Sequence, residues 1–496
     1  MKKIISGLFI LLFIITLVNF NNVQTSVAQS EDQESEFVVN RSETEVSYIM
    51  GGGTVYKESG WTYYNGYTDP STYTNPLQGL KPQTYQWVDM PITSEDVKVV
   101  VWSHGTTDGF KASTTTATAK NFEEENPGWI VVAGANGDWF RINDTCEATN
   151  LMVQNGEVIR PVVEQTDWRP VITWNDKQEV KIGFPTLDSY MSTHIYADSD
   201  TYTANYKNEL EDIQLAGYNC TPSETGITLY TKDCTDEYDL TGYTVYIGKY
   251  DLCRVSYGSR RPFVKGEIVS VVNDLGVTKP LASKGQTMLR EFFLVCKDGS
   301  LDNKLAVGNY VKCQFDLNGE WADVESACGT VNQILDNYEP MHYQSTHIYG
   351  FYDEKTAVKP RLVFGFKEDG SMVAMDIDGR DEMNGHTGLS CFEAGELMRL
   401  AGCKYAYNLD GGGSATLIVR NEYDDFDIVN IPSDGSERNI GNAILFVMRD
   451  PGIRWDIQST TRNDVVFNLE ETGVSNLVTD VKVTIDGKTA EMADGV

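Results

Sequence analysis

Short apolar runs recur along most of the chain, and their length favours strands over helices. Most are about four to eight residues long and are bounded by Gly, Asn, Asp or Pro, as strands commonly are. The clearest runs are VKVVVW (97–102), GWIVVAGANGDWF (128–140), PVITW (170–174), YTVYIG (243–248), EIVSVV (267–272), RLVFGF (361–366), SMVAMDI (371–377) and ATLIV (415–419). This pattern predicts a strand-rich chain.

Helical patterns are few. The clearest covers Cys391 to Ala401, where Ser390 and Glu393 have the spacing of a capping box and Gly402 follows as a stop signal. A second helix is expected over Thr116 to Glu125, ending before a proline. Helices scattered irregularly among many strands, with no repeat of fixed period, predict an α+β fold built on a strand-rich mixed sheet.

The two ends of the chain differ from its body. Lys2 and Lys3 precede an apolar run from Ile4 to Val18, and Ser26-Val27-Ala28 supplies small residues for cleavage after Ala28. This layout predicts a secretory signal peptide, and hence a secreted or cell-surface protein. An uncleaved membrane anchor is the alternative, although the apolar run is short for a spanning helix.

The composition divides the chain further. We expect a signal peptide at 1–28, an acidic leader with a β-rich segment at 29–96, one large domain at 97–450 and a short β-rich extension at 451–496. The glycines at 51–53 lack a neighbouring acid and are interpreted as a turn.

Charge narrows the choice of partners. The chain has 72 Asp and Glu against 40 Lys and Arg, a formal net charge of −32. A surface of this sign repels nucleic acid phosphates and anionic lipid, so neither is an expected partner beyond the signal segment.

The nine cysteines all lie in the part expected to be exported. Export permits disulfides, and Cys220 with Cys234, on either side of an expected hairpin, is the best candidate pair. The odd count leaves at least one thiol free or paired between chains, and buried free cysteines are the alternative.

The segment NLDGGGS (408–414) is the first candidate for chemistry. Its three glycines can turn successive backbone N–H groups toward one point, which creates a concavity that binds anions such as phosphate. Ser414 adds a hydroxyl group, and Asp410 places a carboxylate at the rim. The alternative is a glycine-rich turn in which Asp410 merely caps backbone amides.

Other segments add charged and polar groups. GWIVVAGANGDWF ends in a sharp turn that carries Asn136 and Asp138, and an expected hairpin around residues 368–370 has Arg361 at one end and Asp378-Gly379-Arg380 at the other. Asp378 shares one strand face with Asp376, two residues earlier. This acidic pair does not match a calcium-binding loop, because the further acids of that motif are misplaced.

Together these segments resemble a known family. NLDGGGSATLIV, DGRD with GHTGL and AGELMRLAG, GANGDWF, TNLMVQNGEVI, PRLVFGF and PSDGSERNIGNAILFV look like the ordered motifs of the phosphodiester glycosidase family. The resemblance spans roughly residues 97–449, and residues 241–343 match loosely. This sequence departs from the family at three places: Asn-Gly-Asp-Trp-Phe replaces the usual Asn-Gly-Gly-Phe-Phe, Cys328 and Thr330 stand in a stretch that is usually glycine-rich, and PRLVFG replaces PRTA.

The resemblance implies an exported hydrolase that releases a sugar, such as N-acetylglucosamine, from a sugar-1-phosphodiester and leaves a phosphomonoester. It implies Asp410 as the catalytic carboxylate, with Asp378 or Asp138 as its partner. Arg361 and Arg380 would hold the phosphate as guanidinium forks. The other expected substrate-binding residues are Asn136, His386, Asn408, Gly411, Gly412, Gly413 and Ser414.

Two other functions stay open at this point. The chain could be a non-catalytic glycan-binding protein on the same fold, or a glycosidase acting on glycans without phosphate. No cofactor is expected, and a divalent metal is possible but has no ligand motif in its favour. The expected partner is a glycan with a phosphodiester-linked sugar.

Overall fold

The computed structural model describes most of the body of the chain. The described residues are 41–46, 49–50, 54–55, 62–68, 83–90, 96–106, 109–143, 146–161, 169–255, 262–280, 291–341, 357–381, 386–421, 425–450, 452–460, 465–472, 484–485 and 488–489. The expected signal peptide and the triple glycine at 51–53 lie outside them. Within these ranges, no helix has the length and apolar character needed to cross a membrane.

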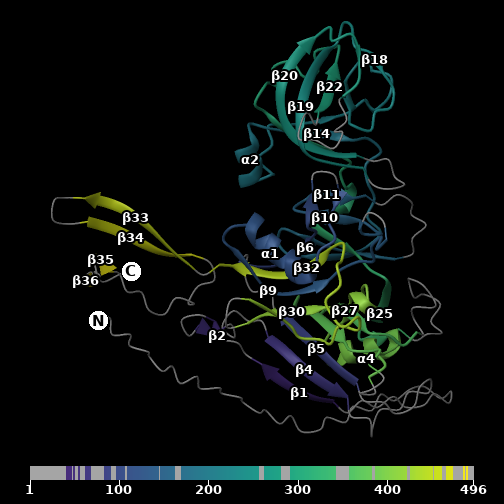
Figure 1. Cartoon of the computed structure of the whole chain (residues 1–496), viewed down its shortest axis with the longest axis vertical. Coiled ribbons are helices and arrows are strands. Elements are labelled where there is room, and N and C mark those ends of the chain that lie inside the picture. Colours follow the sequence, from purple (N-terminus) through teal and green to yellow (C-terminus); the bar gives the residue numbers. More distant parts are fainter. Residues whose placement is uncertain are drawn as a thin grey trace.

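Two antiparallel sheets form the centre of the molecule (Figure 1). The larger sheet has the order β1 (Arg41–Val46), β4 (Thr62–Thr68), β5 (Gln83–Met90), β28 (Met372–Ile377), β27 (Arg361–Phe366), β29 (Tyr405–Asn408), β25 (Asn332–Asp336) and β26 (Glu339–Pro340). The smaller has the order β31 (Phe426–Ile428), β30 (Leu417–Arg420), β9 (Trp129–Asn136), β32 (Ala443–Arg449) and β6 (Val97–Trp102).

Alternating side chains explain how these sheets stack. Leu362 and Phe364 of β27 enter a core that the two sheets share, together with Leu417 and Phe446 of the smaller sheet. Val363, between the first two, points to the opposite face and packs under helix α4 (Cys391–Leu400). Strand residues alternate between the two faces of a sheet. One face of each sheet therefore packs in the shared core, and the other face packs under a helix. The result is a four-layer arrangement with a helix on each outer side.

The second outer helix is α1 (Thr115–Glu125). Phe122 of this helix packs with Trp102 and Leu445, on the face of the smaller sheet that points away from the shared core. Both long helices are those expected from sequence. The capping box of Ser390 and Glu393 is also present, with both of its reciprocal hydrogen bonds.

A third sheet joins the shared core at its edge. Its order is β11 (Glu157–Arg160), β10 (Met152–Gln154), β24 (Val324–Gly329), β12 (Val171–Asn175) and β13 (Val180–Gly183). Trp174 of β12 is fully buried and meets Phe364 edge-on, with ring centroids 5.8 Å apart.

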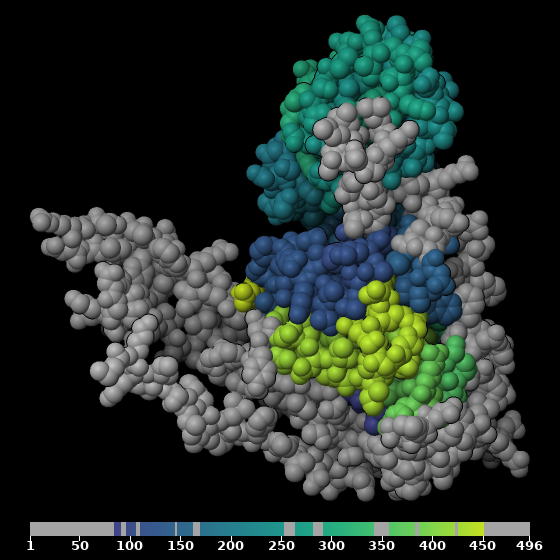
Figure 2. Space-filling view, in the orientation of Figure 1, coloured from purple at the N-terminus to yellow at the C-terminus, as the bar shows by residue number. Residues whose placement is uncertain are grey.

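Between β13 and β24 the chain leaves this sheet and forms a separate unit, which we call the inserted domain (residues 189–315). Its sheet has the order β15 (Glu211–Gln214), β14 (Ser192–Tyr196), β23 (Tyr310–Gln314), β20 (Pro262–Asn273), β19 (Thr244–Val255), β22 (Glu291–Cys296), β17 (Ile227–Tyr230) and β16 (Gly217–Tyr218). It has two hydrophobic clusters of its own, although Phe263 of β20 packs in the core of the central sheets. Figure 2 shows the domain (teal) as a distinct body beside the layers. The expected large domain at 97–450 therefore contains a second folding unit.

Two connecting segments form a neck between the inserted domain and the rest. The Asp188 amide donates to the Asp316 carbonyl at 2.8 Å, the Asn318 amide donates to the Thr186 carbonyl at 3.1 Å, and Leu187 and Leu317 form the bridge between them. The two segments thus run antiparallel and bonded to each other.

The remaining elements belong to none of these four sheets. They are helix α2 (Ser199–Ala204), the 3-10 turns η2 (Gly319–Trp321) and η3 (Gly412–Ser414), and the strand pairs β2 (Ile49–Met50) with β3 (Thr54–Val55), β7 (Gly105–Thr106) with β8 (Gly109–Phe110), β18 (Tyr238–Asp239) with β21 (Val277–Thr278), β33 (Gly452–Thr460) with β34 (Val465–Thr472), and β35 (Thr484–Ile485) with β36 (Lys488–Thr489). Pairing between β16 and β17 is parallel, which makes the inserted sheet mixed. The α+β, strand-rich fold expected from sequence is confirmed, including strands near both ends.

The proposed Cys220–Cys234 disulfide is wrong for this structure. Both thiols are free, Cys220 exposed and Cys234 buried. Burial raises the pKa of the Cys234 thiol, as expected for a thiol that stays protonated. Most of the described cysteines are likewise buried and free, which was the alternative considered from sequence.

Candidate functional site

The loop from Asp410 to Gly413 lines a cavity where the two central sheets meet. The lining consists of Trp139, Lys359, Pro360, Arg361, Arg380, Asn408, Leu409, Asp410, Gly411, Gly412, Gly413 and Arg438. Four of these residues are basic and one is acidic, although the chain as a whole carries −32. A basic concavity on an acidic protein favours an anionic ligand.

The fold places this loop by making it a crossover. β29 belongs to the larger sheet and β30 to the smaller one, so the segment between them passes from one sheet to the other. The Leu409 amide donates to Leu362 of β27 at 2.8 Å, and the Asp410 amide donates to Gly137, just after β9, at 3.0 Å. The loop is therefore fixed to both sheets before its glycines begin.

Asn136 holds the loop at both ends. Its Nδ2 donates to the Asp410 carbonyl at 2.6 Å, and its Oδ1 accepts from the Thr416 amide at 3.0 Å. The side chain is fully buried and does not line the cavity. Asn136, expected to bind substrate, is thus placed as a clamp on the segment that does line the cavity.

Glycine is required at two points of the loop. Gly412 has a φ of 64°, in the left-handed region, and a Cβ there would lie 3.0 Å from Arg380 Nη2. A Cβ on Gly413 would overlap the Arg438 guanidinium and the Asp434 carboxylate. The absent side chains therefore let two guanidinium groups approach the loop backbone.

The three glycine amides of the loop differ in whether they are already hydrogen-bonded within the fold. The Gly412 amide donates to the Pro360 carbonyl at 2.9 Å, so it is already used within the fold. All three glycine amides were expected to hold phosphate, and for Gly412 this bond contradicts that expectation. Gly411 and Gly413 line the cavity on either side of Gly412.

Arg361 is buried at the base of the cavity, with 1% of its surface exposed. Its Nε donates to the Leu389 carbonyl at 3.0 Å, its Nη1 to Asn408 Oδ1 at 3.5 Å, and its Nη2 to the Ala357 carbonyl. These contacts fix the orientation of the guanidinium at the base of the cavity. Asn408, expected to bind substrate, lines the same cavity and orients Arg361.

Two further guanidinium groups come from loops. Arg380 follows β28, is exposed, and has a φ of 57°, a backbone conformation that is strained for any residue other than glycine. Arg438 donates from Nε to Asp434 at 2.8 Å and from Nη1 to Ser414 Oγ at 3.3 Å. Ser414 is therefore buried behind Arg438 and does not itself line the cavity.

Asp378 is buried and is not part of the cavity lining. Its Oδ2 accepts from Thr84 Oγ1 at 2.6 Å and from Gln86 Nε2 at 3.2 Å, and its Oδ1 accepts from the Ile431 amide at 2.6 Å. Burial raises the pKa of this carboxyl, and these hydrogen bonds offset part of the increase. Asp376, on the same face, is fully buried, and burial followed by the Asp378 charge raises its pKa well above the usual range.

His386 belongs to the surroundings of Asp378. Its Nδ1 lies 3.2 Å from Thr84 Oγ1, the hydroxyl that donates to Asp378. It does not line the cavity among the described residues. The structure therefore separates His386 and Asp378 from Asp410 and the arginines with which they were grouped.

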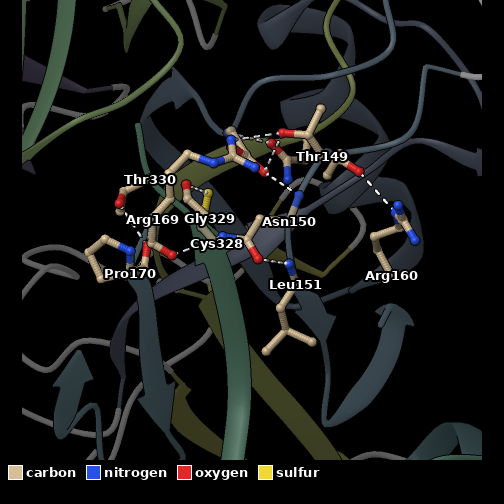
Figure 3. Close-up of polar contacts among 12 residues, drawn as sticks. Thr149, Asn150, Leu151, Arg160, Arg169, Pro170, Cys328, Gly329 and Thr330 are labelled. Atoms are coloured by element: carbon tan, nitrogen blue, oxygen red, sulfur yellow. Dashed lines mark hydrogen bonds and ion pairs between the residues drawn. The ribbon is translucent and has the colours of Figure 1, made fainter. Parts of the chain in front are cut away.

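Asp138 is also buried, in a polar network on the other side of Trp139. Its Oδ2 accepts from the Asn150 amide at 2.8 Å, and its Oδ1 lies 3.4 Å from Arg169 Nη1. Figure 3 shows Arg169, Thr149 and Asn150 converging in this network, with Cys328, Gly329 and Thr330 on the adjoining strand end. A Cβ on Gly329 would lie 2.6 Å from Asp138 Oδ2, so the strand passes directly against the carboxylate.

Sequence reasoning missed five residues of the lining: Trp139, Lys359, Pro360, Leu409 and Arg438. Arg438 stands inside the motif PSDGSERNIGNAILFV, where the charged part was interpreted only as the approach to a strand. Trp139 stands inside GANGDWF, where it was noted only as a departure from the family. Their positions in recognised motifs were the available signal.

The described residues contain no group of three or more His, Cys, Asp or Glu side chains arranged to hold a metal ion. The lining instead offers guanidinium, ammonium and amide N–H donors, with Asp410 as its carboxylate. Donors of this kind suit the oxygens of an anionic ligand.

Comparisons with known proteins agree with this chemistry. The model of the phosphodiester glycosidase family matches residues 271–447. Over 91 residues the chain is 35% identical to the SPbeta prophage-derived uncharacterized protein YomE of Bacillus subtilis (strain 168), a match that covers 18% of this chain and 13% of that protein.

Three solved structures are similar at low sequence identity. A hypothetical protein from Synechocystis is 15% identical, with 79% of this chain and 62% of that chain covered and a TM-score of 0.43. A protein of Burkholderia pseudomallei K96243, provisionally described as exported, is 11% identical, with 86% and 99% covered and a TM-score of 0.43.

The third structure is the catalytic domain of zebrafish N-acetylglucosamine-1-phosphodiester alpha-N-acetylglucosaminidase, auto-inhibited by its pro-peptide. It is 9% identical, with 86% of this chain and 88% of that chain covered and a TM-score of 0.37. The family match at 271–447 includes Arg361, Arg380, Arg438 and the Asp410 loop. Residues 271–447 thus match the phosphodiester glycosidase family, and this matched segment carries most of the cavity lining.

Proposed function

We propose that this protein is an exported hydrolase that cleaves a sugar-1-phosphodiester. It would release an N-acetylglucosamine-like sugar and leave a phosphomonoester on the acceptor, with one water consumed. The observation that carries the proposal is the cavity itself, where four basic residues surround Asp410 and the glycine loop. Export rests on the signal-peptide pattern at residues 1–28.

The lining residues divide the chemical work. Arg361, Arg380 and Arg438 would bind the phosphate oxygens, assisted by the amides of Gly411 and Gly413. Asp410 would activate water or stabilise positive charge at the anomeric carbon. A phosphomonoester is a good leaving group, because its second pKa is about 6. A strong general acid beside the scissile bond is therefore less necessary than in an ordinary glycosidase.

The test is hydrolysis of an N-acetylglucosamine-1-phosphodiester and of wall-derived sugar phosphodiesters by the purified protein. We expect sugar and phosphomonoester in equal amounts, and at least about a hundredfold loss of kcat for Asp410→Asn. Oxygen-labelled water would show which bond breaks, since the label enters either the sugar or the phosphate. No turnover of any substrate, or turnover unaffected by Asp410→Asn, would refute the proposal. The reaction is expected to continue after dialysis against EDTA.

A non-catalytic glycan-binding protein is the second candidate. The observation in its favour is that Asp138 and Asp378 are buried elsewhere, so that Asp410 is the carboxylate of the described lining. Binding of the sugar phosphodiester that persists in Asp410→Asn, without product from the unmodified protein, would favour this candidate. A glycosidase acting on glycans without phosphate would instead release sugar and no phosphomonoester.

A further inference from the structure

Trp139 is the aromatic side chain of the described cavity lining. It follows β9 directly and is half-buried, and the apolar residues Pro360 and Leu409 line the same cavity. The basic residues account for an anionic ligand, but they do not account for a large aromatic surface beside it. Binding sites commonly combine a few polar groups that fix orientation with such apolar surface.

The indole is held in place through its backbone and by a neighbouring arginine. The Thr149 amide donates to the Trp139 carbonyl at 2.7 Å, which fixes the backbone of the turn. The Arg169 guanidinium lies over the indole ring, 5.6 Å from its centroid. Such a cation–π contact restricts the ring as well as stabilising it.

Arg169 is in turn fixed by buried partners. It is 3% exposed, and its Nη1 donates to Thr149 Oγ1 at 2.9 Å and lies 3.4 Å from Asp138 Oδ1. Figure 3 shows the Arg169 side chain reaching across to Thr149 in this arrangement. A chain of contacts therefore runs from Asp138 through Arg169 to the ring at the cavity.

We propose that Trp139 is the stacking surface for the sugar ring of the substrate, and that Arg169 and Asp138 are its positioning residues. A pyranose ring presents a flat face of C–H groups that matches the flat apolar face of an indole. A glycerol-like acceptor has no such face. The inference rests on the proposed function, because the sugar is attached to the phosphate that the arginines bind.

The test compares three probes with the full-length protein by calorimetry: inorganic phosphate, N-acetylglucosamine 1-phosphate and glycerol phosphate. For Trp139→Ala we expect affinity for the sugar phosphate to fall about tenfold, while affinity for the other two probes stays unchanged. Trp139→Phe keeps a flat ring and should lose no more than about threefold.

Trp129 provides a matched control. It lies at the other end of β9, and the Arg449 guanidinium lies over its ring at 4.4 Å, but it does not line the cavity. Trp129→Ala should leave the affinities for all three probes unchanged. A thermal unfolding curve for each variant shows whether it is folded.

A double-mutant cycle tests the positioning role. Arg169→Lys keeps the charge beside Asp138 but lacks the planar group over the ring. Alone it should lower sugar phosphate affinity about threefold, and in Trp139→Ala it should add nothing, since the ring that it positions is gone. If Arg169→Lys lowers sugar phosphate affinity equally in the unmodified protein and in Trp139→Ala, Arg169 does not act through the indole ring.

The outcomes separate this inference from the proposed function. A loss confined to the sugar phosphate supports both. If Trp139→Ala leaves all three affinities unchanged, or lowers those for phosphate or glycerol phosphate equally, the sugar assignment is overturned while the phosphate site stands. If the unmodified protein binds none of the probes, the proposed function fails together with the inference.

Discussion

Basic side chains with little exposure occur in two regions of this protein, and the contacts that hold them differ. Beside the neck, His194 lies 2.6 Å from Glu209 and 3.1 Å from Asp316, and Lys265 lies 3.4 Å from Glu157. In the cavity, Arg361 is held by the carbonyl oxygens of Leu389 and Ala357 and by the Asn408 amide.

The difference indicates what each region does. Carboxylates close to a buried cation compensate its charge within the fold, which is typical of structural ion pairs. Arg361 instead lines a cavity together with three further basic residues, which suits the binding of an anion. Burial alone would not have distinguished the two regions, since both contain side chains with little exposure.

The largest expected effect is a loss of phosphate affinity in the cavity. Arg361→Lys should weaken binding of inorganic phosphate about a hundredfold, because a lysine cannot reproduce the fork of the guanidinium. Arg420 is the control, since it is equally buried and held by the Val131 carbonyl and Glu123 outside the cavity. Titration calorimetry on Arg361→Lys and Arg420→Lys measures both phosphate affinities. Equal losses in the two variants would show that phosphate does not bind at Arg361.

The next effect concerns stability at the neck. His194→Gln should lower the free energy of unfolding by about 2 kcal/mol, because Glu209 and Asp316 lose a buried cationic donor. Phosphate affinity should not change. Denaturant unfolding measures the first quantity and calorimetry the second. A loss of phosphate affinity in a folded His194→Gln protein would show that the two regions are not independent.

The same histidine predicts a dependence on pH. Burial lowers the pKa of His194, but hydrogen bonds from its ring to Asp316 and Glu209 outweigh burial and raise the pKa to about 9. The folded pKa thus exceeds the ordinary value of about 6.5, so the stabilisation is complete below that value and is lost as the pH rises through 9.

We expect the free energy of unfolding to fall by about 1–2 kcal/mol between pH 7 and pH 10. Buried Lys312 lies nearby and its pKa is lowered by burial, which opposes part of this fall. The measurement is therefore the difference between the unmodified protein and His194→Gln along the pH series. If the two proteins differ in free energy of unfolding by the same amount at every pH, His194 is not the group responsible for the pH dependence.

The smallest effect concerns the glycine loop. Gly412→Ala should lower the free energy of unfolding by about 1 kcal/mol, because φ is positive there. It should also lower phosphate affinity a few-fold, since the new Cβ would crowd Arg380. Gly370→Ala, at a positive φ in the hairpin turn and with open space around it, is the control and should cost stability alone.

The sequence predicted the elements better than their grouping. Alternating apolar residues and the capping box at Ser390 were sufficient for the central strands and both long helices, because these signals are local. The inserted domain was not predicted, since the strand at 243–248 has the same apolar pattern as the strand at 361–366. Periodicity shows that a strand is buried, and it does not show which sheet it joins.

The site was predicted in part for a related reason. Asp410, Arg361 and Arg380 line one cavity, and motif order was enough to group them. Asp378 and Asp138 stand just as close to motif residues along the chain. They are turned instead toward Thr84 and toward Asn150, and those partners come from distant segments that no local pattern identifies.

The neck makes the inserted domain removable in principle. Thr186–Asp188 and Asp316–Asn318 already lie hydrogen-bonded side by side. A two-residue Asn-Gly turn could therefore join residue 188 to residue 316 as an ordinary hairpin. The chain would become 125 residues shorter, and the shared core would lose Phe263, the one residue that the inserted domain adds to it among the described residues. A genome could add or delete this module at one place, and a protein engineer could replace it with another.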